Sequence, residues 1–256
     1  MFVSKKNVMT SHIAMWSGPR TISTAMMRAW ESRGDCVVTD EPLYAHYLDH
    51  TQIQHPGFEE VVRSQSTSWQ EVTQSLCGPI PGQQPFWYQK HMTHHLLDHI
   101  DRAWMSHLRH CFLIRHPREV LASYARRRES VTVEDLGFQQ QAEIFQFVRD
   151  ELGRIPLVVD SRELLQQPSV VLRKLCSALG IPFMESMLHW ESGLRATDGV
   201  WAKHWYDSVV QTTGFEPYRE RQFEYPDEYE PFVQEAMPYY QTLFTERVLS
   251  DDSSVQ

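Results

Sequence analysis

Hydrophobic residues recur along the chain in five short runs, separated by longer stretches of mixed polarity. These runs are rich in β-branched and aromatic side chains, a composition typical of β-strands. They predict strands at His12–Trp16, Cys36–Thr39, Phe86–Gln89, Cys111–Ile114 and Leu157–Val159.

Helical patterns lie between several of these runs. In Ser23–Arg33, Met26, Met27 and Trp30 cover one face, and Gly34 is a stop signal. The same period predicts helices at Arg118–Arg128, Gln139–Leu152 and Ser169–Leu179, with Arg126, Arg127 and Arg128 facing outward. We also expect a short helix around Phe58–Arg63. Strands that alternate with helices predict an α/β fold, a three-layer sandwich with a central, mostly parallel sheet.

The chain length suits one domain. Its 256 residues are enough for a single well-buried α/β core, which we expect over residues 1–250. The segment 51–85 is polar and rich in glycine and proline at its turns, so we expect an insertion or a lid there. Residues 251–256 are expected to fray.

Composition narrows the range of partners. Hydrophobic residues make up 41% and charged residues 22%, and the formal net charge is −9, which argues against nucleic acid as the main partner. No apolar stretch approaches the roughly 18 residues of a membrane span, and residues 1–11 lack the apolar core of a signal peptide. We therefore expect a cytoplasmic protein that does not bind membranes. Its four cysteines, none in a Cys-x-x-Cys pair, are expected to be reduced thiols.

A candidate anion site follows the first predicted strand. The segment Ser17-Gly18-Pro19-Arg20-Thr21-Ile22-Ser23-Thr24 leads directly into a helix, and free backbone N–H groups at a helix start attract anions. Ser23 and Thr24 can cap the helix and donate hydroxyls to phosphate, and Arg20 adds a guanidinium. An ATP-type loop would need a second glycine and a Lys-Ser/Thr pair, which are absent here. The alternative is an ordinary capped helix.

A second candidate phosphate contact follows the fourth predicted strand. Arg115 ends that strand, Pro117 starts the next helix, and Ser123 lies about two turns into it. The arginine and the serine can converge on one phosphate. The alternative is a surface arginine beside an unrelated helix serine.

Together these segments resemble the sulfotransferase family. Its 5′-phosphosulfate loop has the pattern Pro-Lys/Arg-Ser/Thr-Gly-Ser/Thr-Thr, which this sequence matches at Pro19, Arg20, Thr21, Ser23 and Thr24. Ile22 stands where the family has glycine, so we expect its φ to be negative. The family's 3′-phosphate motif is matched at Arg115, Pro117, Arg118, Glu119 and Ser123.

The resemblance implies 3′-phosphoadenosine 5′-phosphosulfate as the donor. Residues Gly18 to Thr24 would then form the 5′-phosphosulfate loop, with Arg20 on the transferring sulfonate and Thr21, Ser23 and Thr24 on the 5′-phosphate. A weaker similarity, Gly-x-Trp-x-x-His over residues 199–204, places Arg195 at the 3′-phosphate and Trp201 near the nucleotide. The product would be adenosine 3′,5′-bisphosphate.

Sulfonate transfer requires positioning, stabilisation of the leaving phosphate and a base for the acceptor proton. Arg20 is our choice for the leaving group, and the chemistry requires no metal. Two bases remain open. Glu41 follows the second strand, where an α/β sheet places ligand-contacting groups, whereas His91 lies beside Lys90, as in the Lys-His pair of small-molecule sulfotransferases. We rank Glu41 ahead, and Lys90 would add positive charge near the sulfonate.

Two other functions remain as alternatives: a nucleotide-dependent phosphotransferase or kinase, and a non-catalytic nucleotide-binding protein. The segment Tyr44-Ala45-His46-Tyr47 and residues 51–82 are expected to line the pocket for a small hydroxylated or aminated acceptor. The sequence does not select among such acceptors, nor does it indicate an oligomeric state.

Overall fold

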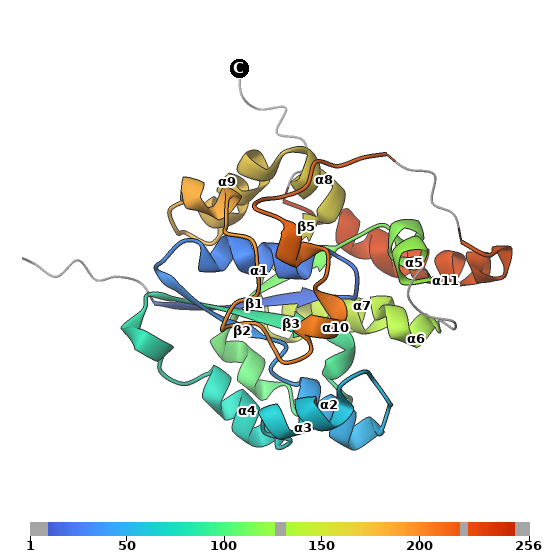
Figure 1. Cartoon of the computed structure of the whole chain (residues 1–256), viewed down its shortest axis with the longest axis horizontal. Coiled ribbons are helices and arrows are strands. Elements are labelled where there is room, and N and C mark those ends of the chain that lie inside the picture. Colours follow the sequence, from blue (N-terminus) through green and yellow to red (C-terminus); the bar gives the residue numbers. More distant parts are fainter. Residues whose placement is uncertain (1–9, 126–131, 221–224, 249–256) are drawn as a thin grey trace, which may run out of the picture.

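The computed structural model describes residues 10–125, 132–220 and 225–248, and one five-stranded parallel sheet lies at its centre (Figure 1). The strand order is β2-β3-β1-β4-β5. Each strand contains the hydrophobic run that predicted it, so all five predictions are confirmed. The strands are β1 Ser11–Ser17, β2 Cys36–Asp40, β3 Phe86–Met92, β4 Arg109–Ile114 and β5 Leu157–Asp160.

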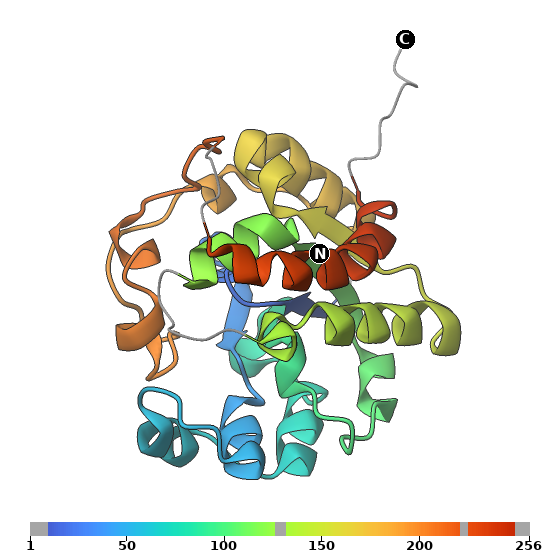
Figure 2. The same ribbon diagram turned by 90° about the vertical axis from the view of Figure 1, so that its right-hand side faces the viewer.

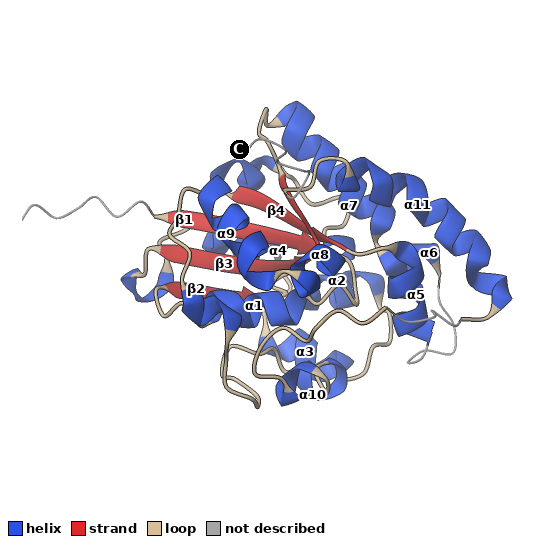
Figure 3. Ribbon diagram, turned by 90° about the horizontal axis from the view of Figure 1, so that it is seen from above, coloured by secondary structure: helices blue, strands red, loops and turns tan. Residues whose placement is uncertain are grey.

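Helices cover both faces of this sheet, which confirms the predicted three-layer α/β fold (Figures 1 and 3). On one face lie α1, α8 and α9. The opposite face carries α7 and α11, with α2, α3 and α4 toward the β2 edge. The helices are α1 Ser23–Glu31, α2 Tyr44–Thr51, α3 Phe58–Ser64, α4 Trp69–Leu76, α5 Pro117–Ala125, α6 Val133–Leu136, α7 Phe138–Gln146, α8 Ser161–Gln166, α9 Pro168–Ala178, α10 Ala202–Trp205 and α11 Glu230–Phe244.

The described residues form three hydrophobic clusters, and the two largest lie on opposite faces of the sheet. Successive side chains of a strand point to opposite faces, so β1 contributes Ile13 and Met15 to one cluster and Ala14 and Trp16 to the other. Met26 and Trp30 of α1 pack in the first cluster, as their spacing predicts. The four cysteines are free thiols.

Several helices depart from the predicted bounds. The helix expected over 139–152 is α7 continued by a π-helical turn, Phe147–Glu151. The outward arginines Arg126, Arg127 and Arg128 lie outside the described residues, as does the tail 251–256. The sequence did not predict α11, which packs beside α5 and α7 (Figure 2) and holds a proline, Pro238, in its interior.

Residues 51–85, expected to be an insertion or lid, form most of the connection between β2 and β3. These strands are parallel neighbours, and parallel neighbours need a crossover of a dozen or more residues. The helices α2, α3 and α4 provide it. His55, from this segment, also lines the cavity described below.

The strand order reverses direction at β1, because β3 lies on one side of it and β4 on the other. In doubly wound sheets, ligands bind beyond the carboxyl ends of the strands at such a switch point. The segment after β1 is the predicted phosphate loop, residues 18–24. The fold therefore places this loop where a ligand is expected.

Candidate active site

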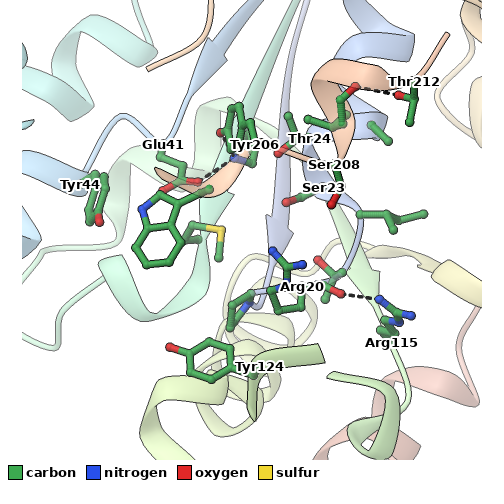
Figure 4. Close-up of a pocket in the computed structure, with 18 of the residues that line it drawn as sticks. Arg20, Ser23, Thr24, Glu41, Tyr44, Arg115, Tyr124, Tyr206, Ser208 and Thr212 are labelled. Atoms are coloured by element: carbon green, nitrogen blue, oxygen red, sulfur yellow. Dashed lines mark hydrogen bonds and ion pairs between the residues drawn. The ribbon is translucent and has the colours of Figure 1, made fainter. Parts of the chain in front are cut away.

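A cavity of about 310 Å³ lies at the carboxyl ends of β1, β2, β3 and β4 (Figure 4). The phosphate loop and the start of α1 form one wall. Residues at the strand ends form the floor of the cavity, and the segment after α10 forms part of another wall. The lining residues from these parts include Pro19, Arg20, Thr21, Ile22, Ser23, Thr24, Glu41, Lys90, Met92, Arg115, Trp205, Tyr206, Ser208, Val209 and Thr212.

Two non-glycine residues of the phosphate loop have left-handed backbone conformations. Arg20 has φ 60°, and Ile22 has φ 63° and ψ 22°. The expected negative φ of Ile22 is therefore wrong: the turn keeps the geometry that glycine would adopt. A non-glycine residue in this region costs roughly 1–2 kcal/mol. Packing of the half-buried Ile22 side chain against the α1 side of the core offsets part of that cost.

The N-terminus of α1 faces the cavity without a side-chain cap. Ile22 occupies the N-cap position and makes no side-chain hydrogen bond, so Ser23 and Thr24 do not cap the helix as predicted. Both lie in the first turn and line the cavity. Uncapped N–H groups at a helix start favour a bound anion, so this arrangement suits a phosphate.

A hydrogen bond within the loop and a close approach to α6 fix the shape of the loop. The buried Thr21 hydroxyl donates to the Gly18 carbonyl at 2.9 Å. A Cβ atom at Gly18 would lie 2.8 Å from the Leu136 carbonyl oxygen, so this position requires glycine. The loop is thus held rigidly against neighbouring backbone.

Arg20 and Arg115 join the two predicted phosphate motifs. Arg115 donates to the Arg20 carbonyl at 2.8 Å and to Glu119 at 2.9 Å, while Arg20 Nε donates to Ser123 Oγ at 3.0 Å. Arg20 and Arg115 line the cavity, and Ser123 contacts the site through Arg20. In the view of Figure 4, Arg20 lies between the Glu41 side of the cavity and Arg115.

The second predicted phosphate motif is also stabilised by an ion pair within it, between Arg115 and Glu119. Burial opposes ionisation of Glu119, but hydrogen bonds from Arg162 and Arg115 outweigh it and lower the pKa of that carboxyl. Arg115 is therefore held by a charged partner on one side and by loop backbone on the other.

Glu41 is part of a buried network of charges at the ends of β2 and β3. Lys90 Nζ donates to Glu41 Oε1 at 2.6 Å, to Asp40 Oδ1 at 2.8 Å and to the Tyr206 hydroxyl at 2.7 Å. Burial raises the pKa of Glu41, although Lys90 opposes that rise. Burial would lower the pKa of Lys90, but Asp40 and Glu41 raise it well above its usual value. Lys90 therefore stays charged and fixes Glu41 at the cavity.

His91 does not reach the cavity. It follows Lys90 in β3, so its side chain points to the opposite face of the sheet, where it stacks on Trp16 with ring centroids 4.4 Å apart. The side chain is buried, and burial together with nearby His110 lowers the pKa of His91 to about 3. Of the two candidate bases, the structure brings Glu41 to the cavity.

Arg195 and Trp201 also lie away from the cavity lining. Arg195 pairs with Glu31, the last residue of α1, about 13 Å along the helix from the phosphate loop. Trp201 is 1% exposed and packs edge-on against Tyr44, so it is a core residue. A Cβ at Gly199 would clash with the Trp201 ring, which explains the glycine of this segment without a nucleotide.

Sequence reasoning missed several aromatic and imidazole groups of the site. Tyr206 and Tyr124 line the cavity, as do His94 and His95. Burial lowers the pKa of His95 well below its usual value, and the ring stacks on Tyr44 at 4.6 Å. The His94-His95 pair so close to β3 was the available signal, but the sequence could not show which side chains turn toward the strand ends.

Within the described parts of the chain, no helix combines the length and the apolar character needed to cross a bilayer. Over the same residues, no group of three or more histidine, cysteine or carboxylate side chains is arranged to hold a metal ion. The expectation that the reaction needs no metal stays a prediction.

Comparisons with known proteins match most of the chain. The family model described as Sulfotransferase domain matches residues 11–247. Branched-chain-amino-acid aminotransferase-like proteins 2 and 1 of Arabidopsis thaliana are 32% and 33% identical to this chain over 231 residues, or 90% of it. The chain spans 41% of the length of each of these curated relatives.

A solved structure shares the fold. It is the sulfotransferase domain of the Synechococcus PCC 7002 olefin synthase, with a TM-score of 0.52 and 16% sequence identity. The match covers 93% of this chain and 98% of that one.

Proposed function

The chain belongs to the sulfotransferase family, and on that basis we propose that it transfers a sulfonate group from 3′-phosphoadenosine 5′-phosphosulfate to a hydroxyl or amine of a small acceptor. One observation carries the proposal. The uncapped start of α1, Arg20 and Arg115 line the same cavity as the Glu41 carboxylate. An anion site and a base therefore share one space.

The donor's 5′-phosphosulfate would lie against the phosphate loop. The backbone N–H groups at the start of α1 and the hydroxyls of Ser23 and Thr24 would hold the 5′-phosphate. Arg115 and Ser123 would bind the 3′-phosphate. Arg195, paired with Glu31, has no part in this proposal.

In the chemical step, the acceptor oxygen or nitrogen attacks the sulfur in line with the bridging phosphate oxygen. A new bond to sulfur forms, and the bond from sulfur to the bridging oxygen breaks. Glu41 takes the acceptor proton, while Arg20 and the α1 N–H groups stabilise the charge on the leaving phosphate. Lys90 holds Glu41 in place and opposes the rise in the Glu41 pKa that burial causes.

The wall opposite the loop supports a small organic acceptor. Tyr44, Trp205, Tyr206 and Val209 give it mainly aromatic and apolar side chains, as is typical of small-molecule sites. We also propose that the enzyme acts in the cytoplasm, because its four cysteines are unpaired and reducing compartments keep thiols free.

A transfer assay tests this function. The purified protein is incubated with donor carrying ³⁵S in the sulfonate group and a panel of phenols, aliphatic alcohols and amines. Labelled product should form together with equimolar adenosine 3′,5′-bisphosphate. Arg20→Ala should reduce the rate more than donor affinity, because leaving-group charge develops in the transition state, and Arg20→Lys should restore part of it. Full activity in Arg20→Ala would overturn the role of the loop.

A further inference from the structure

Asp40, the last residue of β2, holds three groups that come from two separate parts of the chain, β3 and the segment around α10. Its Oδ1 accepts a hydrogen bond from Lys90 at 2.8 Å. Its Oδ2 accepts one from the Tyr206 hydroxyl at 2.6 Å and one from the Gly199 backbone N–H at 3.1 Å. The Asp40 side chain is 2% exposed, so it contacts these partners rather than solvent.

Through Lys90, Asp40 governs the position of Glu41. A lysine ammonium has three N–H donors, and Lys90 directs them to Asp40, Glu41 and Tyr206. The Lys90 side chain is 1% exposed. Without the Asp40 carboxylate, the ammonium would lose one of its three hydrogen-bond partners, and its position relative to Glu41 would be less well fixed.

Through Tyr206 and Gly199, Asp40 also holds one wall of the cavity. Both residues belong to the segment around α10, and Trp205, Ser208 and Val209 of that segment line the cavity. Trp201 Nε1 donates to the Tyr206 hydroxyl at 3.3 Å, so the buried end of the segment is fastened to the same network. Glu41 and this wall therefore share one anchor.

We propose that Asp40 is a positioning residue for sulfonate transfer: it orients the Glu41 carboxylate through Lys90 and holds the acceptor wall through Tyr206 and Gly199. The part that Asp40 plays in catalysis rests on the proposed function. Its structural basis, the three hydrogen bonds of a buried carboxylate, does not depend on the identity of the acceptor.

The charges around Glu41 determine the direction in which its pKa should shift when Asp40 or Lys90 is replaced. Burial raises the pKa of Glu41, Lys90 lowers it and Asp40 raises it. Removing the Asp40 charge should therefore lower the pKa of Glu41, and removing the Lys90 charge should raise it. The other titratable or charged side chains that line the cavity are Arg20, Tyr44, His55, His94, His95, Arg115, Tyr206 and Glu216, and they are unchanged in both variants.

Asp198 provides a matched control. It is also a buried carboxylate, 3% exposed, and it holds the same segment through the Arg195 N–H at 2.8 Å and Arg28 at 2.6 Å. These hydrogen bonds join it to Arg28 and to the Arg195 backbone rather than to Lys90 or Tyr206. If Asp40 merely stabilised the segment, Asp40→Asn and Asp198→Asn would behave alike.

The test is a ¹³C NMR pH titration of protein labelled at the glutamate carboxyl carbons, with the Glu41 signal assigned from Glu41→Gln. In Asp40→Asn the pKa of Glu41 should fall, and in Lys90→Met it should rise. Asp198→Asn should leave it unchanged. The proposal would be overturned if the Glu41 pKa were unchanged in a folded Asp40→Asn or Lys90→Met variant. It would also be overturned if Asp198→Asn shifted the Glu41 pKa as Asp40→Asn does.

A kinetic measurement completes the test without a known acceptor. Hydrolysis of ³⁵S-labelled donor, with water as the acceptor, should be roughly 10–100-fold slower in Asp40→Asn, as for other partners that orient a reacting group, while affinity for adenosine 3′,5′-bisphosphate stays the same. Wild-type hydrolysis rates in Asp40→Asn would contradict the positioning role. Loss of the proposed function itself would look different, because wild-type protein would then show no transfer at all.

Discussion

At the scale of single residues, Glu41 has two properties of a general base: its side chain borders the cavity, and its carboxylate pairs with the buried ammonium of Lys90. The backbone at Glu41 has φ 41°, and its N–H donates to the Lys90 carbonyl at 2.9 Å. Backbone and side chain thus both tie it to the end of β3. A carboxylate held so firmly can accept a proton without reorganisation.

Glu41→Gln should preserve nucleotide binding and reduce turnover by roughly 10²–10⁴-fold. The amide keeps the size of the side chain and can still accept from Lys90, but it cannot take a proton. In the wild type, burial raises the pKa of Glu41, so the acid limb of the kcat profile should lie above the ordinary glutamate range. Glu71→Gln, at an exposed position, is the control. An active Glu41→Gln would show that another group takes the proton.

His91→Asn should lower stability rather than turnover, because His91 packs in the core. Loss of the stack on Trp16 should reduce the free energy of unfolding at pH 7 by about 1–2 kcal/mol. Turnover per folded molecule should be retained. Urea unfolding and donor hydrolysis measure the two quantities, and a loss of turnover with unchanged stability would reverse the roles of Glu41 and His91.

The same variant should also change the pH dependence of stability. The pKa of His91 is about 3 in the folded protein and about 6.5 for an unperturbed histidine. The unfolded chain therefore binds the proton more tightly, so stability is full above about pH 6.5 and falls as pH falls toward 3. His91→Asn should flatten this decline, whereas exposed His107→Asn should not.

At the scale of elements, the loop between β1 and α1 carries strain at a defined position. Ile22 is left-handed, where glycine has no steric cost. Ile22→Gly should therefore be more stable than Ile22→Ala by about 1 kcal/mol, which inverts the usual order. The exposed Val170 in α9 is the control: there Val170→Gly should be less stable than Val170→Ala by about 1 kcal/mol, which is the usual order. Thermal unfolding of the four variants checks this, and an Ile22→Ala that is the more stable of its pair would contradict it.

The sequence predicted elements well where hydrophobic runs and turns agree, as in the five strands. It failed where tertiary contacts decide. The sign of φ at Ile22 depends on how the loop meets α6 and the core, and the face of His91 depends on the β3 register. In α11, Pro238 lies inside the helix and interrupts the signal that would otherwise predict it.

Across the whole molecule, the site depends on chain segments that are far apart in sequence. Arg20 and Ser123 are separated by 103 positions, and Asp40 and Tyr206 by 166. The motifs predicted that Arg20 and Ser123 would both contact one ligand, but not that Arg20 would donate to Ser123. No motif included Tyr206, so the part of the acceptor wall around α10 could be found only from the fold. Arg195 shows the converse: its assignment to the 3′-phosphate rested on a weak family similarity, and the fold pairs it with Glu31 at the far end of α1.

The central claim is that the cavity binds a 3′-phosphorylated adenine nucleotide. Isothermal titration calorimetry with adenosine 3′,5′-bisphosphate and with 5′-AMP tests it most directly. The bisphosphate should bind more tightly by roughly 2–4 kcal/mol, from charge-assisted contacts of Arg115 and Ser123 to the 3′-phosphate. Arg115→Ala should remove most of that preference, and Arg195→Ala should keep it. Equal affinities for the two nucleotides in the wild-type protein would contradict the account.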